Sequence, residues 1–297
     1  MSAFSGRHLL LVGPGYAARA VAGLVIAAGG SVSAAIRDPA RAEALAAEGI
    51  RALALDADGR LDPARLAGGT DLLVSAPPTP EGCPGLRALG EAWPPSLRWI
   101  GYYSSTAVYG DCGGEWIDET RAPAPRTADA KGRLTAEAAW TAAARRHGAA
   151  LDILRIAGIY GPGTRNVLGQ LRSGTARAIV KPGQVFNRIH RDDIAAATLA
   201  AMRAPDGVRL TNLADGAPSP ASEVLAGVAR MLGLPEPPAV AFDKAGLPPG
   251  AAGFYAENRR IRADRLAALP GFRLAYPDWR AGYAAILASE GLATAPA

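Results

Sequence analysis

Cysteine is scarce in this sequence of 297 residues, and its scarcity excludes two classes of protein. The two cysteines, Cys83 and Cys112, are too few for a framework of several disulfides or for a cysteine-based zinc site. This use of cysteine is typical of a reducing compartment. Histidine is also rare, and His190 has no second histidine or cysteine at ligand spacing. We therefore predict that the protein holds no metal.

Long apolar runs are absent as well. No apolar stretch reaches about 18 residues without a charge or a strand-like break, and the N-terminus lacks the pattern of a secretory signal. We therefore expect a cytoplasmic protein that does not enter a membrane. The 35 glycines and 24 prolines make up about a fifth of the chain, less than in low-complexity sequences. A core of ordinary size can form.

The positive charge has little pattern. The net charge is +5 and the isoelectric point is about 9.5, values that occur in nucleic-acid-binding proteins. However, the basic residues are dispersed, and the densest groups, at 145–146 and 259–262, lack aromatic residues that could stack on bases. We expect no nucleic-acid partner, and a small anionic ligand suits this charge equally well.

Short apolar runs rich in branched residues alternate with alanine-rich segments over the first half of the chain. The runs lie at residues 9–12, 32–36, 50–55, 72–74, 97–103 and 151–156. Parallel strands buried on both faces have this pattern, and the intervening segments are long enough for crossover helices. The sequence therefore predicts an α/β fold with a doubly wound, Rossmann-like parallel sheet.

The alternation becomes irregular after Ile156, where glycine and proline break the chain into turns. A strand at 186–190, a helix at 194–202 capped by Asp192 or Asp193, and a strand at 208–213 are predicted to return to the main sheet. We assign residues 1–157 and 184–216 to a dinucleotide-binding domain. Residues 158–183 and 217–297 are assigned to a smaller C-terminal cap that binds the substrate.

A glycine-rich turn follows the first predicted strand and opens a helix. Gly13 permits a tight turn, Gly15 lets the backbone approach a pyrophosphate, and Ala18 allows close helix packing. The helix N-terminus then presents unpaired N–H groups to the anion. The pattern G-x-G-x-x-A in this position predicts dinucleotide binding, whereas the alternative is a turn that serves only helix–strand packing.

The residue expected to contact the adenosine ribose is an arginine. Arg37 ends the second predicted strand, where an acidic residue would bind the ribose 2′-hydroxyl of NAD. An arginine favours the 2′-phosphate of NADP. NADP is therefore the predicted cofactor; NAD is the alternative if Asp38 contacts the ribose instead.

Four segments in order resemble the extended short-chain dehydrogenases/reductases, the NAD(P)-dependent epimerases, dehydratases and reductases. They are the glycine turn, the Ser-Ser-x-x-Val-Tyr-Gly segment at 104–110, the segment 155–163 and the segment 188–195. The short glycine turn is similar to that of the atypical branch. The candidate cofactor residues are Gly13, Gly15, Tyr16, Ala17, Ala18, Arg37, Asp56, Ala76, Ser104, Ile156 and Gly158.

The resemblance implies that Ser105 hydrogen-bonds the substrate oxygen. It also implies a Tyr-x-x-x-Lys pair on the next helix, where the lysine lowers the pKa of the tyrosine. One alignment puts Asp129 and Arg133 at these positions, and a shift of two residues gives Thr127 and Lys131. Neither supplies a tyrosine. The candidate catalytic residues are therefore Ser105, Asp129, Lys131 and Arg133.

Other residues could complete the site. Four tyrosines near predicted strand ends, Tyr102, Tyr103, Tyr109 and Tyr160, are candidate proton donors, although a structural role is favoured for Tyr109 and for Tyr160. The mixed aromatic and basic segment 254–260 could shape a pocket for an anionic group. The candidate substrate-binding residues are Thr106, Tyr109, Tyr160, Arg188 and His190.

Two functions compete at this stage. The first is an NADP-dependent oxidoreductase or epimerase/dehydratase that acts on a small carbonyl or sugar-nucleotide-like molecule. The second is a non-catalytic NADP-binding sensor, since the proton-transfer pair is missing. The family often forms dimers through the helices next to the fifth strand, so a homodimer through residues 84–92 and 129–147 is also expected.

Overall fold

A seven-stranded parallel sheet forms the centre of the protein in a computed structural model, which describes residues 4–66, 68–163 and 166–292. The strand order is β11-β7-β5-β4-β1-β2-β3, and every neighbouring pair is parallel. The predicted fold class is confirmed. The strands are β1 (His8–Val12), β2 (Ser31–Ile36), β3 (Ile50–Ala54), β4 (Asp71–Val74), β5 (Trp99–Ser105), β7 (Ala150–Ile156) and β11 (Val208–Leu213).

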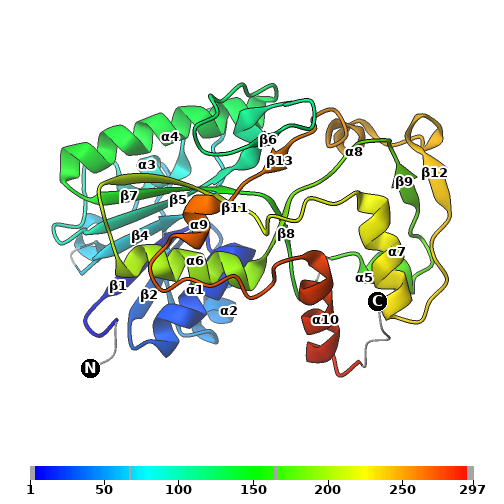
Figure 1. The fold of residues 1–297 in the computed structure, drawn as a ribbon. Helices are drawn as coiled ribbons and strands as arrows, with labels where there is room; N and C mark the ends of the chain where they lie inside the picture. Colours follow the sequence, from blue (N-terminus) through cyan, green and yellow to red (C-terminus); the bar gives the residue numbers. More distant parts are fainter. Residues whose placement is uncertain (1–3, 67, 164–165, 293–297) are drawn as a thin grey trace.

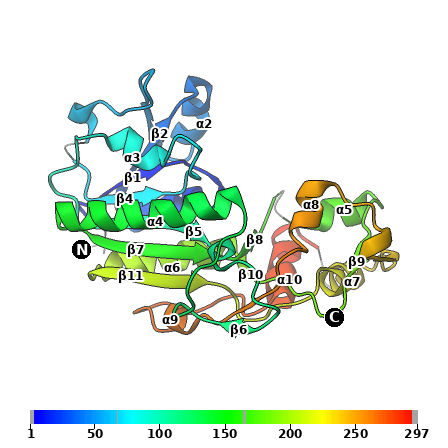
Figure 2. The same cartoon turned by 90° about the horizontal axis from the view of Figure 1, so that it is seen from above.

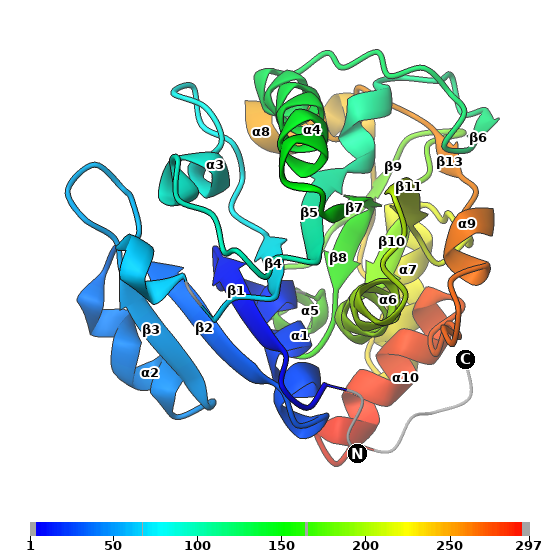
Figure 3. The same ribbon diagram turned by 90° about the vertical axis from the view of Figure 1, so that its left-hand side faces the viewer.

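Helices cover both faces of this sheet, which explains the continuous apolar runs of its strands. Figures 1 and 3 show α1 (Tyr16–Ala27) and α6 (Arg191–Arg203) on one face. The opposite face is covered by α3 (Pro84–Leu89) and α4 (Ala128–His147). Each face has its own apolar core, with α1 and α6 contributing to one and α3 and α4 to the other. Short segments α2 (Ala42–Ala46), η1 (Pro39–Arg41) and η2 (Pro63–Arg65) join the outer strands.

The direction of winding reverses between β1 and β4. β1 pairs with β2 on one side and with β4 on the other, so the crossover helices on the two sides lie on different faces. Ligands in such sheets bind at the carboxyl ends of the strands beside this reversal. The candidate site therefore lies above β1, β4, β5 and β7.

The segment predicted as a strand at 186–190 does not return to the main sheet. The strand within it, β10 (Arg188–His190), pairs with β8 (Gly158–Tyr160) in a separate two-stranded sheet. That prediction was wrong because β7 and β11 already pair along the edge where it would have entered. β11 does join the main sheet, as predicted.

The predicted cap of α6 was also wrong. His190 is the N-cap, since its Nδ1 accepts the backbone N–H of Asp192 at 3.2 Å. The buried carboxylate of Asp193 instead accepts the N–H groups of Ala275 and Tyr276, at 2.8 and 3.1 Å. These bonds hold the C-terminal segment against α6. The role of Asp193 thus depends on residues that follow it by 82 and 83 positions.

A smaller unit lies beside the sheet, on the right in Figure 1 and again in Figure 2. Its apolar core joins the segment from β8 to α5, α7 and α10. Two small parallel pairs accompany it, β12–β9 within this unit and β13–β6 against the main body. The remaining elements are α5 (Leu168–Arg172), α7 (Ala221–Met231), α8 (Pro249–Gly253), α9 (Asp264–Ala267), α10 (Trp279–Ser289), β6 (Trp116–Ile117), β9 (Ala178–Val180), β12 (Ala239–Ala241), β13 (Arg260–Ile261), η3 (Thr106–Tyr109) and η4 (Phe242–Lys244).

Within the described ranges, none of the helices combines the length and the apolar character that crossing a membrane requires.

Candidate active site

The glycine turn leaves room for a ligand backbone. Gly13 has a φ of +85°, and a Cβ atom there would lie 2.5 Å from the backbone nitrogen of Ala76, so only glycine fits. Gly15 is the N-cap of α1, makes no side-chain cap bond, and precedes a first turn without an acidic residue. The N–H groups of this turn are thus placed to receive an anion.

The next three residues anchor the turn. Ala17 and Ala18 are buried where α1 packs in the core that it shares with α6. The hydroxyl of Tyr16 donates to the carbonyl oxygen of Pro162 at 2.6 Å, and the Arg191 guanidinium lies 5.0 Å from the centre of the Tyr16 ring. The Tyr16 side chain therefore connects the glycine turn to the loop that follows β8.

Several arginines surround the position expected for the adenosine end of a dinucleotide. Arg37 lines a cavity of about 390 Å³ together with Asp56 and Arg87. Arg41 lies next to the glycine turn, where its Nη2 donates to the carbonyl oxygen of Pro14 at 3.2 Å. The alternative ribose ligand, Asp38, uses its carboxylate to cap η1 through the N–H of Ala40. Sequence reasoning missed Arg41 and Arg87, although Arg41 stands only four residues after Arg37.

A larger cavity of about 750 Å³ opens at the carboxyl ends of β5 and β7. The main body contributes the ends of both strands, the start of η3 and the first turns of α4. The later part of the chain covers it with residues 185–187 and parts of 249–259. The cavity thus brings together five predicted residues that lie on four elements: Ser105, Thr106, Asp129, Arg133 and Ile156.

Ser105 is fixed by the chain that follows it. Its Oγ accepts the N–H of Ala107 at 3.1 Å and thereby caps η3. The hydroxyl hydrogen stays available for an oxygen in the cavity. Thr106 is buried and lines the same cavity. Two hydroxyl groups therefore face the space above β5.

The family model of the NAD-dependent epimerase/dehydratases matches residues 97–213, which include β5, α4 and β7. The chain belongs to this family. The chain is also 31% identical over 178 residues to the protein YeeZ of Escherichia coli K12, a match that covers 60% of this chain and 58% of YeeZ. The chain thus spans less than two thirds of that relative.

Two further relatives are informative. A functionally unknown conserved protein from Silicibacter pomeroyi has a solved structure that is 42% identical, covers 95% of this chain and 99% of its own, and superposes with a TM-score of 0.88. A 3-diazoavenalumate denitrifying reductase from Streptomyces is 29% identical over 144 residues, which is 44% of this chain and 45% of the reductase. The resemblance inferred from the motifs is confirmed at the level of the family and its fold.

This member of the epimerase/dehydratase family differs at the proton-transfer pair. Asp129 is exposed at the edge of the large cavity, and Arg133 donates from Nη1 to the Tyr103 carbonyl oxygen at 2.9 Å. In the shifted alignment, Thr127 is the N-cap of α4 through the N–H of Ala130, and Lys131 is exposed and lies outside the cavity lining. Both residues of the first alignment thus line the cavity, whereas of the second only Thr127 does.

None of the four candidate tyrosines lines the large cavity. The hydroxyls of Tyr103, Tyr109 and Tyr160 contact Thr198, Asn212 and the Asp278 carbonyl respectively, at 2.8, 2.8 and 3.2 Å. Burial raises the pKa of each of the four above that of free tyrosine. The described part of the chain thus offers no tyrosine as a proton donor to this cavity.

Ser104 is part of a buried polar network. Its hydroxyl donates to Oε1 of Glu137 at 2.6 Å, and Arg155 binds both oxygens of that carboxylate, at 3.0 and 2.7 Å. The Arg155 guanidinium also lies 4.7 Å from the centre of the Tyr109 ring. The network joins β5, α4 and β7 directly below the large cavity, and it uses the Ser104 side chain within the protein.

The remaining predicted residues lie between the sheet and the smaller unit. Arg188 donates from Nη1 to the carbonyl oxygens of Phe186 and Ser219, both at 3.0 Å. The buried His190 ring contacts Tyr160 and Tyr276, and burial lowers its pKa. Gly158 donates its N–H to the Asn187 carbonyl at 3.1 Å. None of Arg188, His190 and Gly158 lines the large cavity.

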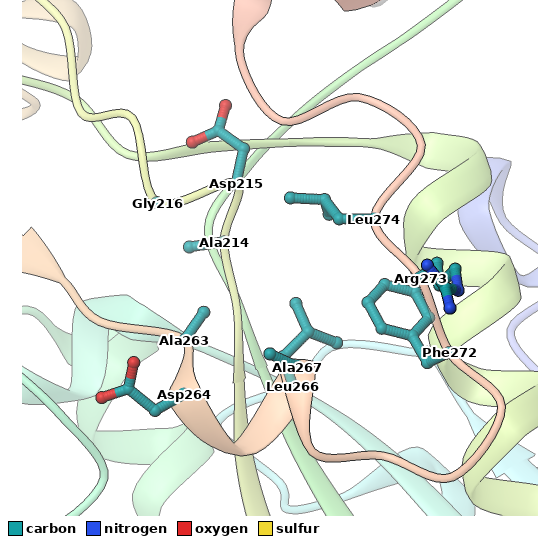
Figure 4. A pocket seen from close by; sticks show the side chains of 10 residues that line it. All are labelled: Ala214, Asp215, Gly216, Ala263, Asp264, Leu266, Ala267, Phe272, Arg273 and Leu274. Carbon is teal, nitrogen blue, oxygen red and sulfur yellow. The ribbon is translucent and has the colours of Figure 1, made fainter.

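A third cavity, of about 670 Å³, lies beyond β11 (Figure 4). Leu274 extends toward Ala214 and Asp215 across this cavity. Asp215 is buried, its Oδ1 accepts the N–H of Ala217 at 3.0 Å, and its Oδ2 has no partner among the described residues. Burial raises the pKa of Asp215 to about 7. In the described ranges, no group of three or more histidine, cysteine or acidic side chains is arranged to hold a metal ion.

Proposed function

We propose that this protein is an NADP-dependent oxidoreductase of the epimerase/dehydratase family that acts on a small carbonyl or hydroxyl compound. The observation that carries the proposal is the position of Ser105. Its hydroxyl is held by Ala107 and opens into a 750 Å³ cavity at the carboxyl end of β5. A fixed donor at that place would hold the oxygen of a substrate whose carbon exchanges a hydride.

The glycine turn fits the cofactor. The missing side chain of Gly13 and the uncapped first turn of α1 provide the close backbone approach and the N–H groups that a pyrophosphate needs. Arg37 and Arg41 would bind the 2′-phosphate of NADP through charge-assisted hydrogen bonds. When bound, the nicotinamide supplies or accepts the hydride.

The proton would pass through a different residue than in relatives with a Tyr-x-x-x-Lys pair. Asp129 occupies the position of the tyrosine and lies in the cavity lining, so its carboxylate is our candidate for the acid/base group. The positive charge of Arg133 would stabilise the negative charge that develops on the substrate oxygen held by Ser105.

Replacing Ser105 by alanine tests the catalytic half of the proposal. We expect kcat/KM for NADPH consumption with a responsive carbonyl compound to fall about 100-fold, because one fixed donor to the reacting oxygen is lost. The matched control is Ser173→Ala, an exposed hydroxyl beyond α5, which should leave the rate unchanged. Undiminished turnover by Ser105→Ala would remove this residue from the mechanism.

Replacing Arg37 and Arg41 together by alanine tests the cofactor half. We expect the Kd for NADPH to rise at least tenfold and the Kd for NADH to change little, since only NADPH carries the 2′-phosphate. Arg51→Ala is the control, because this exposed arginine lies at the amino end of β3. Equal losses for the two dinucleotides would contradict the assignment of NADP.

A non-catalytic NADP sensor is the second candidate, and the absence of any tyrosine from the described lining of the large cavity favours it. A sensor would bind NADPH and NADP with different affinities and change its shape or oligomeric state between them. It would also leave NADPH unconsumed with every member of a panel of aldehydes, ketones and nucleotide sugars. Turnover with any member decides for the enzyme.

A further inference from the structure

One arginine of the large cavity has an unused binding edge. Arg259 stands just before β13 and lines the cavity beside Glu257. Its Nη1 donates to the carbonyl oxygen of Gly110 at 2.6 Å and to Oε2 of Glu257 at 2.7 Å. These two contacts come from different parts of the chain and fix the plane of the guanidinium.

The opposite edge of Arg259, formed by Nε and Nη2, has no acceptor among the described residues. Nε is fully buried without a hydrogen bond, and the side chain as a whole is only 15% exposed. A buried donor that lacks an acceptor is costly, so such groups mark places where a partner is expected.

Other arginines of the same chain show what this edge binds. In four of them Nε and Nη2 together bind one carboxylate, and the donor–acceptor distances are 2.7–3.0 Å in the Arg155–Glu137 and Arg209–Asp152 pairs. The carboxylate belongs to the protein in each case. The four pairs are Arg7 with Asp71, Arg19 with Glu48, Arg155 with Glu137, and Arg209 with Asp152.

The charges around Arg259 favour a ligand with a single negative charge. The cavity lining contains two arginines, Arg133 and Arg259, and two acids, Asp129 and Glu257. The Glu257 carboxylate already neutralises part of the Arg259 charge at 2.7 Å. A diphosphate would be repelled by the two acids, whereas one carboxylate can fill the free edge.

The rest of the cavity is suited to an apolar ligand body. Pro77, Pro78 and Ile156 line it from the side of the sheet. Phe254, at the end of α8, also lines it and is 75% exposed, which is unusual for a large apolar side chain. A ring or chain bound between these surfaces would cover Phe254.

We propose that the ligand of the large cavity is a small monocarboxylate with an apolar body. Its carboxylate binds the Nε and Nη2 edge of Arg259, and its body packs against Phe254. In the reaction considered above, the same molecule presents its carbonyl or hydroxyl oxygen to Ser105. Only this last point rests on the proposed function, because binding of the carboxylate requires no chemistry.

Titration of the NADP-saturated protein with benzoate and benzamide, followed by NMR, tests the proposal. These probes have the same ring and differ in the charged group. We expect benzoate to bind with a Kd in the millimolar range, as befits so small a ligand, and benzamide to bind at least tenfold more weakly. Weaker binding of benzoate than of benzamide would overturn the proposal.

Substitutions then locate the contact. Arg259→Gln should weaken benzoate at least tenfold, and Arg259→Lys should weaken it too, because lysine keeps the charge but lacks the two-donor edge. Arg260→Gln is the matched control, since the neighbouring guanidinium contacts Gly114 and does not line the cavity. Loss of benzoate binding in Arg133→Gln but not in Arg259→Gln would refute the assignment.

Two further measurements separate the possible failures. Inorganic phosphate that binds the Arg259 edge more tightly than benzoate does would contradict the preference for a monocarboxylate. The Kd for NADPH should be the same in wild type and Arg259→Gln, which also shows that the variant is folded. If the wild type does not bind NADPH, the proposed function is wrong. The titration with benzoate in the absence of cofactor still tests whether a carboxylate binds at Arg259.

Discussion

Replacing Glu137 by glutamine is expected to lower the free energy of unfolding by about 3–5 kcal/mol. Glu137 accepts hydrogen bonds from Ser104 and from two nitrogens of Arg155, and its side chain and that of Arg155 are 6% and 4% exposed. Glutamine has nearly the same shape but leaves the buried guanidinium without a counter-charge. Urea denaturation at neutral pH measures the loss.

The control for this variant is Glu115→Gln. Glu115 pairs with Arg121 at 3.4 Å, but both side chains are largely exposed, so the loss should be under about 1 kcal/mol. The triple variant Ser104→Ala, Glu137→Leu, Arg155→Met should recover much of the stability, because no unpaired polar group from this set then stays buried. A loss for Glu137→Gln as small as that for Glu115→Gln would show that the network contributes little.

The second large effect concerns pH. Asp215 has a pKa of about 7 in the folded protein, well above that of an exposed aspartate. Between about pH 4 and pH 7 the folded state therefore holds a proton that the unfolded state has released. The contribution of this group is fully present below about pH 4 and is lost as the pH rises to about 7. We expect the loss of this contribution to lower the free energy of unfolding by up to about 4 kcal/mol between pH 4 and pH 7.

Asp215→Asn should flatten this part of the pH profile. The amide can still accept the N–H of Ala217, and it carries no charge at any pH, so the variant should gain stability relative to wild type as the pH rises from 4 to 7. Asp264→Asn is the control, since this aspartate lines the same cavity but is exposed (Figure 4). Denaturation series at pH 5 and pH 8 give the comparison, and parallel profiles for Asp215→Asn and wild type would contradict the prediction.

Sequence reasoning succeeded where local chemistry decides. The apolar runs identified six of the seven strands of the main sheet to within a few residues, because a strand buried on both faces must be apolar along its length, and the seventh, β11, matches the separately predicted strand at 208–213. The pattern at 13–18 placed the glycine turn, because Gly13 must adopt a positive φ against the backbone of Ala76. The segment 104–110 likewise located Ser105 at the cavity.

Helix caps and the smaller unit were less predictable. Asp192 and Asp193 both fit the start of α6 by residue type, yet the cap is His190, and Asp193 binds backbone groups of residues 275 and 276. Local propensity cannot distinguish these outcomes, since the choice depends on which segment packs beside the helix. The same holds for residues 186–190, whose strand pairs with β8 rather than with the main sheet.

The sequence by itself determined the doubly wound sheet, the dinucleotide turn and the absence of a tyrosine from the usual position on α4, because each follows from residue types at short separations. Only the tertiary structure brought Arg41 to the glycine turn and Arg259 to the same cavity as Ser105. Arg259 is 154 residues from Ser105 in the chain. Its free edge exists because Gly110 and Glu257 occupy the other one, a pairing that no local pattern encodes.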